Sequence, residues 1–273
     1  MKPVHLNSEA IGIIAGGGQF PLMVAGALRK QGFRVVAAAH FGETEPSISD
    51  KVDGIFWLKL GQLGQLIRGL KREGVKKALM AGSITKRRLF GDVRPDLRGL
   101  GVMSKLAIFH DDDILRALAS ELAKEGIEVI SSTTCLPELL APSGCLTKRK
   151  PRKSEKEDIQ FGWEVAKELG RLDIGQCVVV RNKTVLAVEA IDGTDETIRR
   201  GGRLAKKDAI VVKVSKPNQD LRFDVPAVGL ETVRVMSQVK ASVLAVEAGK
   251  TLIFDKLEMI AFSDRAGISI TSH

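Results

Sequence analysis

Short apolar runs alternate with amphipathic stretches along the first half of the chain. The apolar runs have the length of buried strands, and the stretches between them repeat apolar residues at helical spacing. The predicted strands cover residues 11–15, 34–39, 77–81 and 127–131, and the predicted helices begin near residues 21, 60 and 111. Alternating strands and helices are typical of a parallel α/β layer. We therefore expect an N-terminal Rossmann-like parallel-sheet domain over residues 1–140.

The pattern changes in the second half, where strands follow one another directly. Residues 177–180 and 185–189 flank a turn in which Asn182 can adopt positive φ, which predicts a hairpin. Residues 243–246 and 251–254 form a second hairpin candidate. A further strand is expected at 210–214, with helices at 158–170, 194–201, 230–240 and 256–264. This order predicts a C-terminal mixed α+β domain over residues 158–273.

Residues 141–157 interrupt both patterns. They contain prolines, a glycine and the basic run Lys148–Lys153, which resist packing into a core. We interpret the segment as an inter-domain linker. Its cations are either solvated or in contact with phosphate or acidic lipid.

Composition narrows the class of protein. The chain is 44% hydrophobic and 27% charged, as globular proteins are, and its net charge of +9 favours anionic partners. No apolar run approaches the ~20 residues that span a bilayer, and the N-terminus lacks the apolar core of a signal peptide, so a cytoplasmic location is expected. The spacing of three cysteines gives neither a disulfide framework nor a zinc site. Few aromatic residues are available to stack on bases, so no nucleic-acid partner is expected.

A glycine-rich loop follows the first strand and opens the first helix. Gly16, Gly17, Gly18 and Gln19 are candidate substrate-binding residues, because glycines admit a ligand to the backbone and a helix N-terminus favours an anion. A tight strand-to-helix turn is the alternative. Pro21 occupies the third glycine position of a dinucleotide fingerprint, and the second strand ends without an acidic residue. A nicotinamide-dependent oxidoreductase is therefore the disfavoured alternative function.

Two further polar stretches follow predicted strands on the same side of the sheet. Residues 81–88 offer hydroxyls and cations to phosphate, and within them Gly82 and Ser83 are candidate substrate-binding residues. The acidic run 111–113 favours a helix N-terminus and is an alternative metal site.

Carboxylates gather in two segments of the second half. Glu189, Asp192 and Asp195 lie within seven residues at the end of a strand. Asp220 and Asp224 flank Arg222, and in an extended segment these three side chains would share one face. Carboxylates beside Arg222 and Lys213 suit the binding of Mg²⁺ or the activation of water. Surface turns with ordinary ion pairs are the alternative.

At these segments the chain resembles the LpxI-type UDP-2,3-diacylglucosamine pyrophosphatases. The resemblance covers nearly the whole chain, through the segments 13–21, 81–83, 111–116, 172–176, 188–195 and 219–226. It implies a nucleotide-binding-like N-terminal domain, a C-terminal catalytic domain and a lipid substrate held between them. The implied reaction is Mg²⁺-dependent hydrolysis to UMP and 2,3-diacylglucosamine 1-phosphate, with water attacking the β-phosphorus, in lipid A synthesis.

The resemblance also implies a catalytic aspartate, which falls on Asp224. From their chemistry, Asp220, Arg222 and Lys213 are further catalytic candidates, and Asp224, Glu189 and Asp195 are the candidate metal ligands. Thr194 and Gln219 are added to the candidate substrate-binding residues. The chain departs from the family at Gln19, where an acidic residue is common, and at Asp192, where glutamate is common.

The resemblance implies that the reaction takes place at the inner face of a Gram-negative inner membrane. With no obvious amphipathic helix, we expect contact with that membrane to be peripheral and electrostatic. A homo-oligomer is compatible with the sequence. A non-enzymatic nucleic-acid or membrane-binding module is another hypothesis, and it leaves the carboxylates unexplained.

Overall fold

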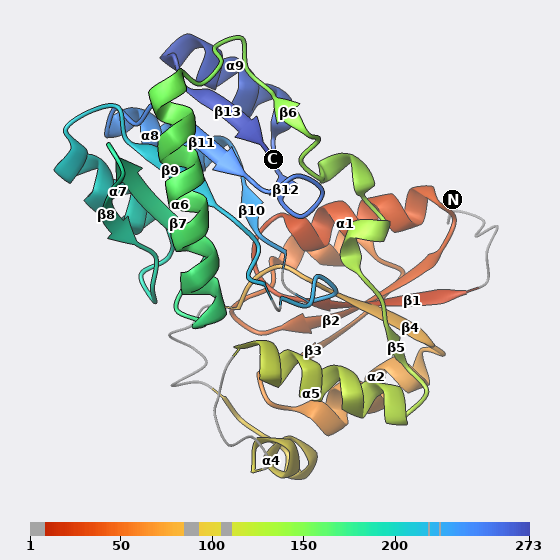
Figure 1. Cartoon of the computed structure of the whole chain (residues 1–273). Helices are drawn as coiled ribbons and strands as arrows, with labels where there is room; N and C mark the ends of the chain where they lie inside the picture. Colours follow the sequence, from red (N-terminus) through yellow and green to blue (C-terminus); the bar gives the residue numbers. More distant parts are fainter. Residues whose placement is uncertain (1–8, 85–92, 105–110, 218, 224) are drawn as a thin grey trace. The chain divides into compact units, whose positions relative to one another are not determined.

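The computed structural model describes residues 9–84, 93–104, 111–217, 219–223 and 225–273, which form two compact units that divide after Leu136 (Figure 1). Both units combine helices with sheets, as predicted. Among the described residues, no helix has both the length and the apolar character needed to cross a bilayer.

The N-terminal unit is built on a parallel sheet with the strand order β3-β2-β1-β4-β5. Its central strands are buried on both faces, which explains their continuous apolar sequence: Val35 to Ala39 are fully buried. The sequence did not predict the edge strand β3. The elements are β1 (Ala10–Ala15), α1 (Phe20–Lys30), β2 (Arg34–His40), η1 (Pro46–Lys51), β3 (Gly54–Leu58), α2 (Leu63–Arg72), β4 (Lys77–Ala81), α4 (Leu97–Met103), α5 (Asp111–Lys124), β5 (Glu128–Val129) and η2 (Ser132–Thr134).

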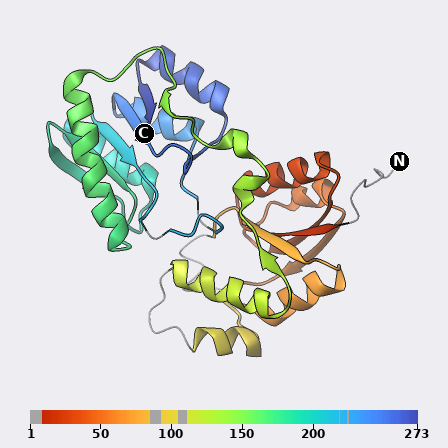
Figure 2. The same ribbon diagram turned by 45° about the vertical axis from the view of Figure 1, so that its right-hand side comes forward.

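Helices cover both faces of this sheet, with α1 on one side and α2 and α5 on the other (Figure 2). Helix α1 buries Val24 and Leu28, and α2 buries Leu66 and Leu70. Because the apolar positions of each helix lie on one side, each seals one face of the sheet. The unit has the predicted Rossmann-like architecture.

The C-terminal unit contains a six-stranded mixed sheet with the order β6-β13-β11-β9-β7-β8 and a two-stranded sheet of β10 and β12. Strands β9, β11 and β13 are parallel, while β6 and β7 are antiparallel to their neighbours. The elements are η3 (Pro137–Leu139), β6 (Gly144–Cys145), α6 (Lys153–Arg171), β7 (Cys177–Arg181), β8 (Thr184–Val188), α7 (Thr194–Ala205), β9 (Ile210–Lys213), β10 (Ala227–Val228), α8 (Leu230–Gln238), β11 (Val243–Val246), β12 (Leu252–Ile253), α9 (Lys256–Ala266) and β13 (Ser269–Ser272).

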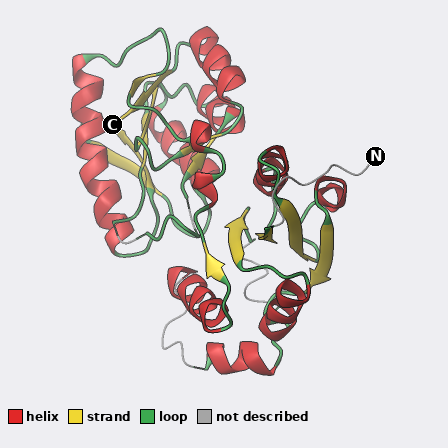
Figure 3. Ribbon diagram, turned by 90° about the vertical axis from the view of Figure 1, so that its right-hand side faces the viewer, coloured by secondary structure: helices red, strands yellow, loops and turns green. Residues whose placement is uncertain are grey.

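Two hydrophobic cores lie on opposite faces of the mixed sheet. Val178 and Val180 face α6, whereas Cys177 and Val179 belong to the core beneath α7, α8 and α9. This alternation along β7 follows from the two-residue period of a strand. The sheet therefore lies between α6 and the other three helices (Figure 3).

One predicted hairpin is confirmed and the other is wrong. Strands β7 and β8 pair through a turn in which Asn182 and Lys183 have φ of 48° and 54°. Strand β11, by contrast, lies between β9 and β13, and β12 pairs with β10. All four residues of β11 are buried, so it is an interior parallel strand with a neighbour on each side.

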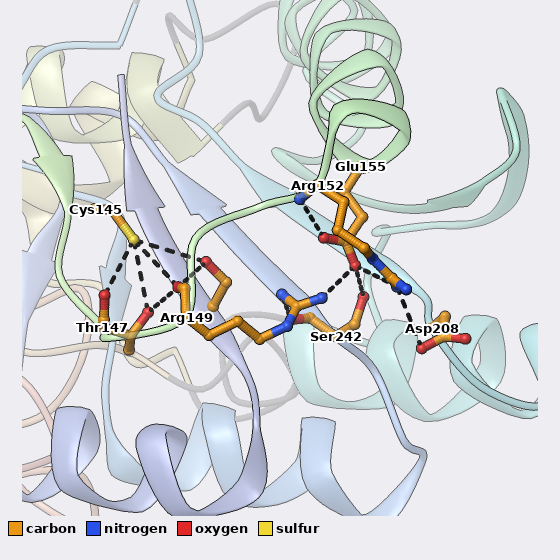
Figure 4. A network of polar contacts seen from close by, with 8 residues as sticks. Cys145, Thr147, Arg149, Arg152, Glu155, Asp208 and Ser242 are labelled. Atoms are coloured by element: carbon orange, nitrogen blue, oxygen red, sulfur yellow. Dashed lines mark hydrogen bonds and ion pairs between the residues drawn. The ribbon is translucent and has the colours of Figure 1, made fainter.

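The segment 141–157, predicted as a linker, is part of the C-terminal unit. It contributes β6 and the first turns of α6, and two of its basic residues, Arg149 and Arg152, pair with a buried carboxylate. Glu155 Oε1 accepts hydrogen bonds from Arg149 Nη2 at 2.6 Å, Arg152 Nη2 at 2.8 Å and Ser242 Oγ at 3.0 Å (Figure 4). Ion pairs thus hold these two arginines to the start of α6, and the Arg149 carbonyl also accepts a hydrogen bond from Ser269 in β13.

Removing the charge of Glu155 should destabilise this unit. Burial favours the neutral carboxyl, but hydrogen bonds from Arg152 and Arg149 outweigh it and lower the pKa of Glu155 to about 2. The depressed pKa means that the ionised carboxylate stabilises the folded state, so Glu155→Gln should reduce the free energy of unfolding at pH 7 by about 3 kcal/mol, as measured by urea denaturation.

The effect should depend on pH with a defined sign. Since the folded-state pKa is depressed from 4.5 to about 2, the stabilisation is complete above pH 4.5 and is lost as the pH falls toward 2. Wild type and variant should therefore converge in acid. Glu157→Gln, which removes an exposed pair with Lys183, is the control and should cost under about 1 kcal/mol. Equal losses in both variants would contradict the role of Glu155.

Candidate functional site

Four strands of the mixed sheet end at one edge. Strand β8 runs parallel to β9, because each is antiparallel to β7, and β9 is parallel to β11 and β13. Glu189 follows β8, Lys213 ends β9 and Glu247 follows β11. In open α/β sheets ligands bind beyond the carboxyl ends of strands, so this edge is the candidate active site of the unit.

A hydrogen-bonded chain links three predicted site residues at this edge. Lys213 Nζ donates to Thr194 Oγ1 at 3.0 Å, and Thr194 Oγ1 donates to Glu189 Oε1 at 2.7 Å. Lys213 also donates to the carbonyl of Ala227 at 2.9 Å. Glu189 and Lys213 are each only 8% exposed. The structure thus brings the segment around residue 189 onto the end of β9.

The thiol of Cys177 lies beneath these charges. Burial raises the pKa of Cys177, with further contributions from the charges of Glu189 and Asp195, and Lys213 opposes them. Asp195 therefore belongs to the same electrostatic environment as Glu189 and Lys213. Gly175 makes this packing feasible, because a Cβ there would lie 2.2 Å from the Glu189 carbonyl oxygen.

Asp192 stabilises the local turn, unlike Glu189, which is hydrogen-bonded to Thr194. It accepts hydrogen bonds from the Ala190 amide and from Arg200, at 3.2 and 2.7 Å. Although burial opposes it, these bonds hold the pKa of Asp192 below its usual value. Asp192 closes the turn and anchors it to α7.

The segment around Asp220 is a turn, so the predicted extended conformation is wrong. The Phe223 amide donates to the Asp220 carbonyl at 3.0 Å, and Arg222 grips the carboxylate of Asp220 through Nε and Nη2, at 2.9 and 2.7 Å. The two side chains pair with each other because the turn brings them together. Asp224, the predicted catalytic aspartate, lies outside the described residues.

A second polar cluster at the same edge was not predicted. Glu247 Oε2 accepts hydrogen bonds from Lys167 Nζ at 2.7 Å and from the Ser215 amide at 2.9 Å. Burial opposes ionisation of Glu247, but hydrogen bonds from Lys167, Lys250 and the Ser215 amide hold its pKa below the usual value. The cluster fixes the start of the loop that follows β9.

Gln219, predicted to bind substrate, stabilises that same loop. Its Oε1 accepts hydrogen bonds from Ser215 Oγ at 3.1 Å and from the Lys216 amide at 2.9 Å. The loop is therefore fixed near its start by Gln219 and Glu247, and Lys213 binds its far end through Ala227.

The described carboxylates at this edge meet only part of what a metal ion requires. No group of three His, Cys, Asp or Glu side chains within the described ranges has the geometry to hold a metal. Glu189 already accepts hydrogen bonds from Thr194 and the Gln176 amide. Mg²⁺, however, is usually held by one or two carboxylates together with substrate phosphates. Among the described residues, this edge would supply at most part of such a donor set, because both carboxylate oxygens of Glu189 already accept hydrogen bonds.

The predicted loops of the N-terminal unit are joined to each other. The amide of Gly16 donates to the Ala81 carbonyl at 2.8 Å, and that of Gly17 donates to the Ser83 carbonyl at 2.7 Å. A Cβ on Gly16 or Gly82 would lie 2.5 Å from a carbonyl oxygen of the opposite loop. These glycines are therefore required by close loop packing, and the amides of Gly16 and Gly17 are not directed at an anion.

The other predicted residues near this junction are placed differently. Gly18 has φ of 85° and open space around its Cβ position. Gln19 precedes α1 as its N-cap without a capping side-chain hydrogen bond. The cations at 86–88, predicted to face phosphate, lie outside the described residues. Helix α5 begins at Asp111, as the acidic run predicted.

Comparison with known proteins places both units in one family. The LpxI N-terminal domain model matches residues 10–139, and the LpxI C-terminal domain model matches residues 142–271. A curated relative, the UDP-2,3-diacylglucosamine pyrophosphatase LpxI of Caulobacter vibrioides, is 34% identical over 273 residues, covering 95% of this chain and 96% of that protein.

Similarity to solved structures is much weaker. The ADP complex of purK, an N5-carboxyaminoimidazole ribonucleotide synthetase, has a TM-score of 0.29 and 15% identity over 66% of this chain and 34% of that chain. Pyruvate carboxylase of Rhizobium etli has a TM-score of 0.29 and 13% identity over 70% of this chain and 15% of that chain. Such scores carry no argument about function. The two domain models and the identity along nearly the whole chain show that this protein belongs to the LpxI family.

Proposed function

We propose that the protein hydrolyses UDP-2,3-diacylglucosamine to UMP and 2,3-diacylglucosamine 1-phosphate, as a step of lipid A synthesis. The observation that carries the proposal is the 34% identity, over 95% of the chain, to a pyrophosphatase named for that substrate. The hydrogen-bonded cluster of Glu189, Thr194 and Lys213 at the carboxyl edge supports it, because a diphosphate substrate requires cations and hydrogen-bond donors. Neither the domain models nor the curated relative supports a nicotinamide-dependent oxidoreductase.

In the proposed reaction, water attacks the β-phosphorus and the anhydride bond to the α-phosphate breaks, so that the bridging oxygen leaves with UMP. Asp224 orients the water and accepts its proton. Lys213 stabilises the developing charge, since its ammonium has three N–H groups and two acceptors among the described residues. Arg222, which is paired with Asp220, adds a second positive charge that stabilises the same developing charge.

Mg²⁺ is the proposed cofactor. Asp224, Glu189 and Asp195 are the residues that would hold it, and the ion would neutralise charge on the diphosphate oxygens. Thr194, placed between Glu189 and Lys213, orients both side chains. Its hydroxyl makes the one direct link between them that the described residues show.

We also propose a cytoplasmic protein in peripheral contact with the inner membrane. The support is the net charge of +9, which favours an anionic surface, and a substrate whose acyl chains belong in a bilayer.

Replacing the proposed catalytic aspartate should greatly lower turnover. Asp224→Ala should lower the rate of UMP release on the order of 10³-fold, the usual contribution of a group that positions or deprotonates the attacking water. The fold should be preserved, as judged by circular dichroism and melting temperature. Glu258→Ala, an exposed change in α9, is the matched control. Near-wild-type turnover of the Asp224 variant would refute the assignment.

The site of attack can be read from the fate of the oxygen. In ¹⁸O-labelled water, the label should enter the acylated sugar phosphate, because the new bond forms at the β-phosphorus. Mass spectrometry of both products measures this. Label in UMP would mean attack at the α-phosphorus and would overturn the mechanism while leaving the substrate assignment intact.

A further inference from the structure

The turn after β2 is fastened to the end of β1. His40, the last residue of β2, is 8% exposed, and its Nδ1 lies 2.9 Å from the Ala15 carbonyl oxygen. Thr44 Oγ1 donates to the same oxygen at 2.6 Å and accepts from the His40 amide at 2.9 Å. Two side chains from residues 40–44 thus hold the turn beside the strand that leads into the glycine loop.

These contacts define the protonation of His40. A carbonyl oxygen only accepts hydrogen bonds, so Nδ1 carries the hydrogen. Burial lowers the pKa of His40, against smaller opposing effects of the Ala15 carbonyl and Glu43, and the ring is neutral at pH 7. The second ring nitrogen, Nε2, is therefore an acceptor.

The Nε2 atom is accessible at this edge. Within the described residues Nε2 makes no hydrogen bond, and it is not fully buried. A buried imidazole therefore presents one lone pair to the surface at the carboxyl end of β2.

Glu43 places a carboxylate next to the same loop. Its carbonyl oxygen and its Oε2 lie 3.1 and 3.6 Å from the position that a Cβ on Gly17 would occupy. The missing side chain of Gly17 lets the loop pack closely against the turn that carries this carboxylate. In Rossmann-like sheets an acidic residue near the end of the second strand binds the ribose of a nucleotide. The sequence lacks that residue at the strand end, and the turn supplies one three residues after His40.

We propose that His40 Nε2 and the Glu43 carboxylate bind the ribose hydroxyls of the uridine nucleotide. The choice of uridine rests on the proposed function. A ribose diol offers two O–H donors, which match the two acceptors. An analogue that lacks one hydroxyl leaves an acceptor without its donor, and sites built for a hydroxyl reject such analogues strongly.

Titration calorimetry of the full chain with UMP, 2′-deoxy-UMP and 3′-deoxy-UMP tests the proposal. Wild type should bind UMP at least about tenfold more tightly than each of the deoxy analogues. In Glu43→Ala the ratio should fall to near one for the analogue that lacks the hydroxyl bound by Glu43. Because all three ligands carry the same phosphate, the ratio is insensitive to the general gain in affinity for anions that follows loss of a negative charge. Glu45→Ala, an exposed change two residues away, should keep the wild-type ratio.

Three results would overturn the proposal: equal affinity of wild type for all three ligands, unchanged ratios for both deoxy analogues in Glu43→Ala, or no binding of UMP at millimolar concentration. Hydrolysis of UDP-2,3-diacylglucosamine is measured on the same preparations. Hydrolysis without discrimination against the deoxy analogues would refute the ribose site alone. Discrimination without hydrolysis would refute the proposed reaction and retain the ribose site.

Discussion

The C-terminal unit depends on hydrogen-bond acceptors for the buried ammonium group of Lys213. Transferring a charged lysine from water into a protein is costly unless hydrogen bonds compensate it. Lys213 meets this requirement with one hydroxyl from the start of α7 and one carbonyl from β10. Strand β9, helix α7 and the return of the loop after β9 must therefore assemble together. The constraint that stabilises the unit is the same one that arranges its charges at the edge of the sheet.

Local pattern predicted most of the fold. The buried strands of the N-terminal sheet and the turn at Asn182 follow from residue type and spacing, since both depend on the immediate neighbours in sequence. The pairing of β11 does not, because an apolar run is compatible with several neighbours. The basic run Lys148–Lys153 looked solvated for a similar reason. Within that run Arg149 donates to the carbonyl of Ser242, which lies in a distant part of the chain, and its partner Glu155 is recognisable as buried only in the folded structure.

The candidate site shows the same limit. Glu189 and Thr194 were identified because they are close in sequence. Glu247 was missed, since its partners Lys167 and Ser215 are dispersed and no motif joins them. The carboxylate of Glu43 was missed because a turn moves it back toward the glycine loop. Asp220 and Arg222 were correctly seen as neighbours, but the turn pairs them with each other.

Burial beside the carboxylates at this sheet edge makes the thiol of Cys177 unreactive. Its thiol is fully buried under Glu189 and Asp195, and its raised pKa leaves almost no thiolate at neutral pH. The sulfur is therefore a poor nucleophile despite its polar surroundings. Alkylating reagents will reach the thiol only when β7 separates from its sheet. The rate of alkylation of Cys177 therefore reports how often the C-terminal unit opens.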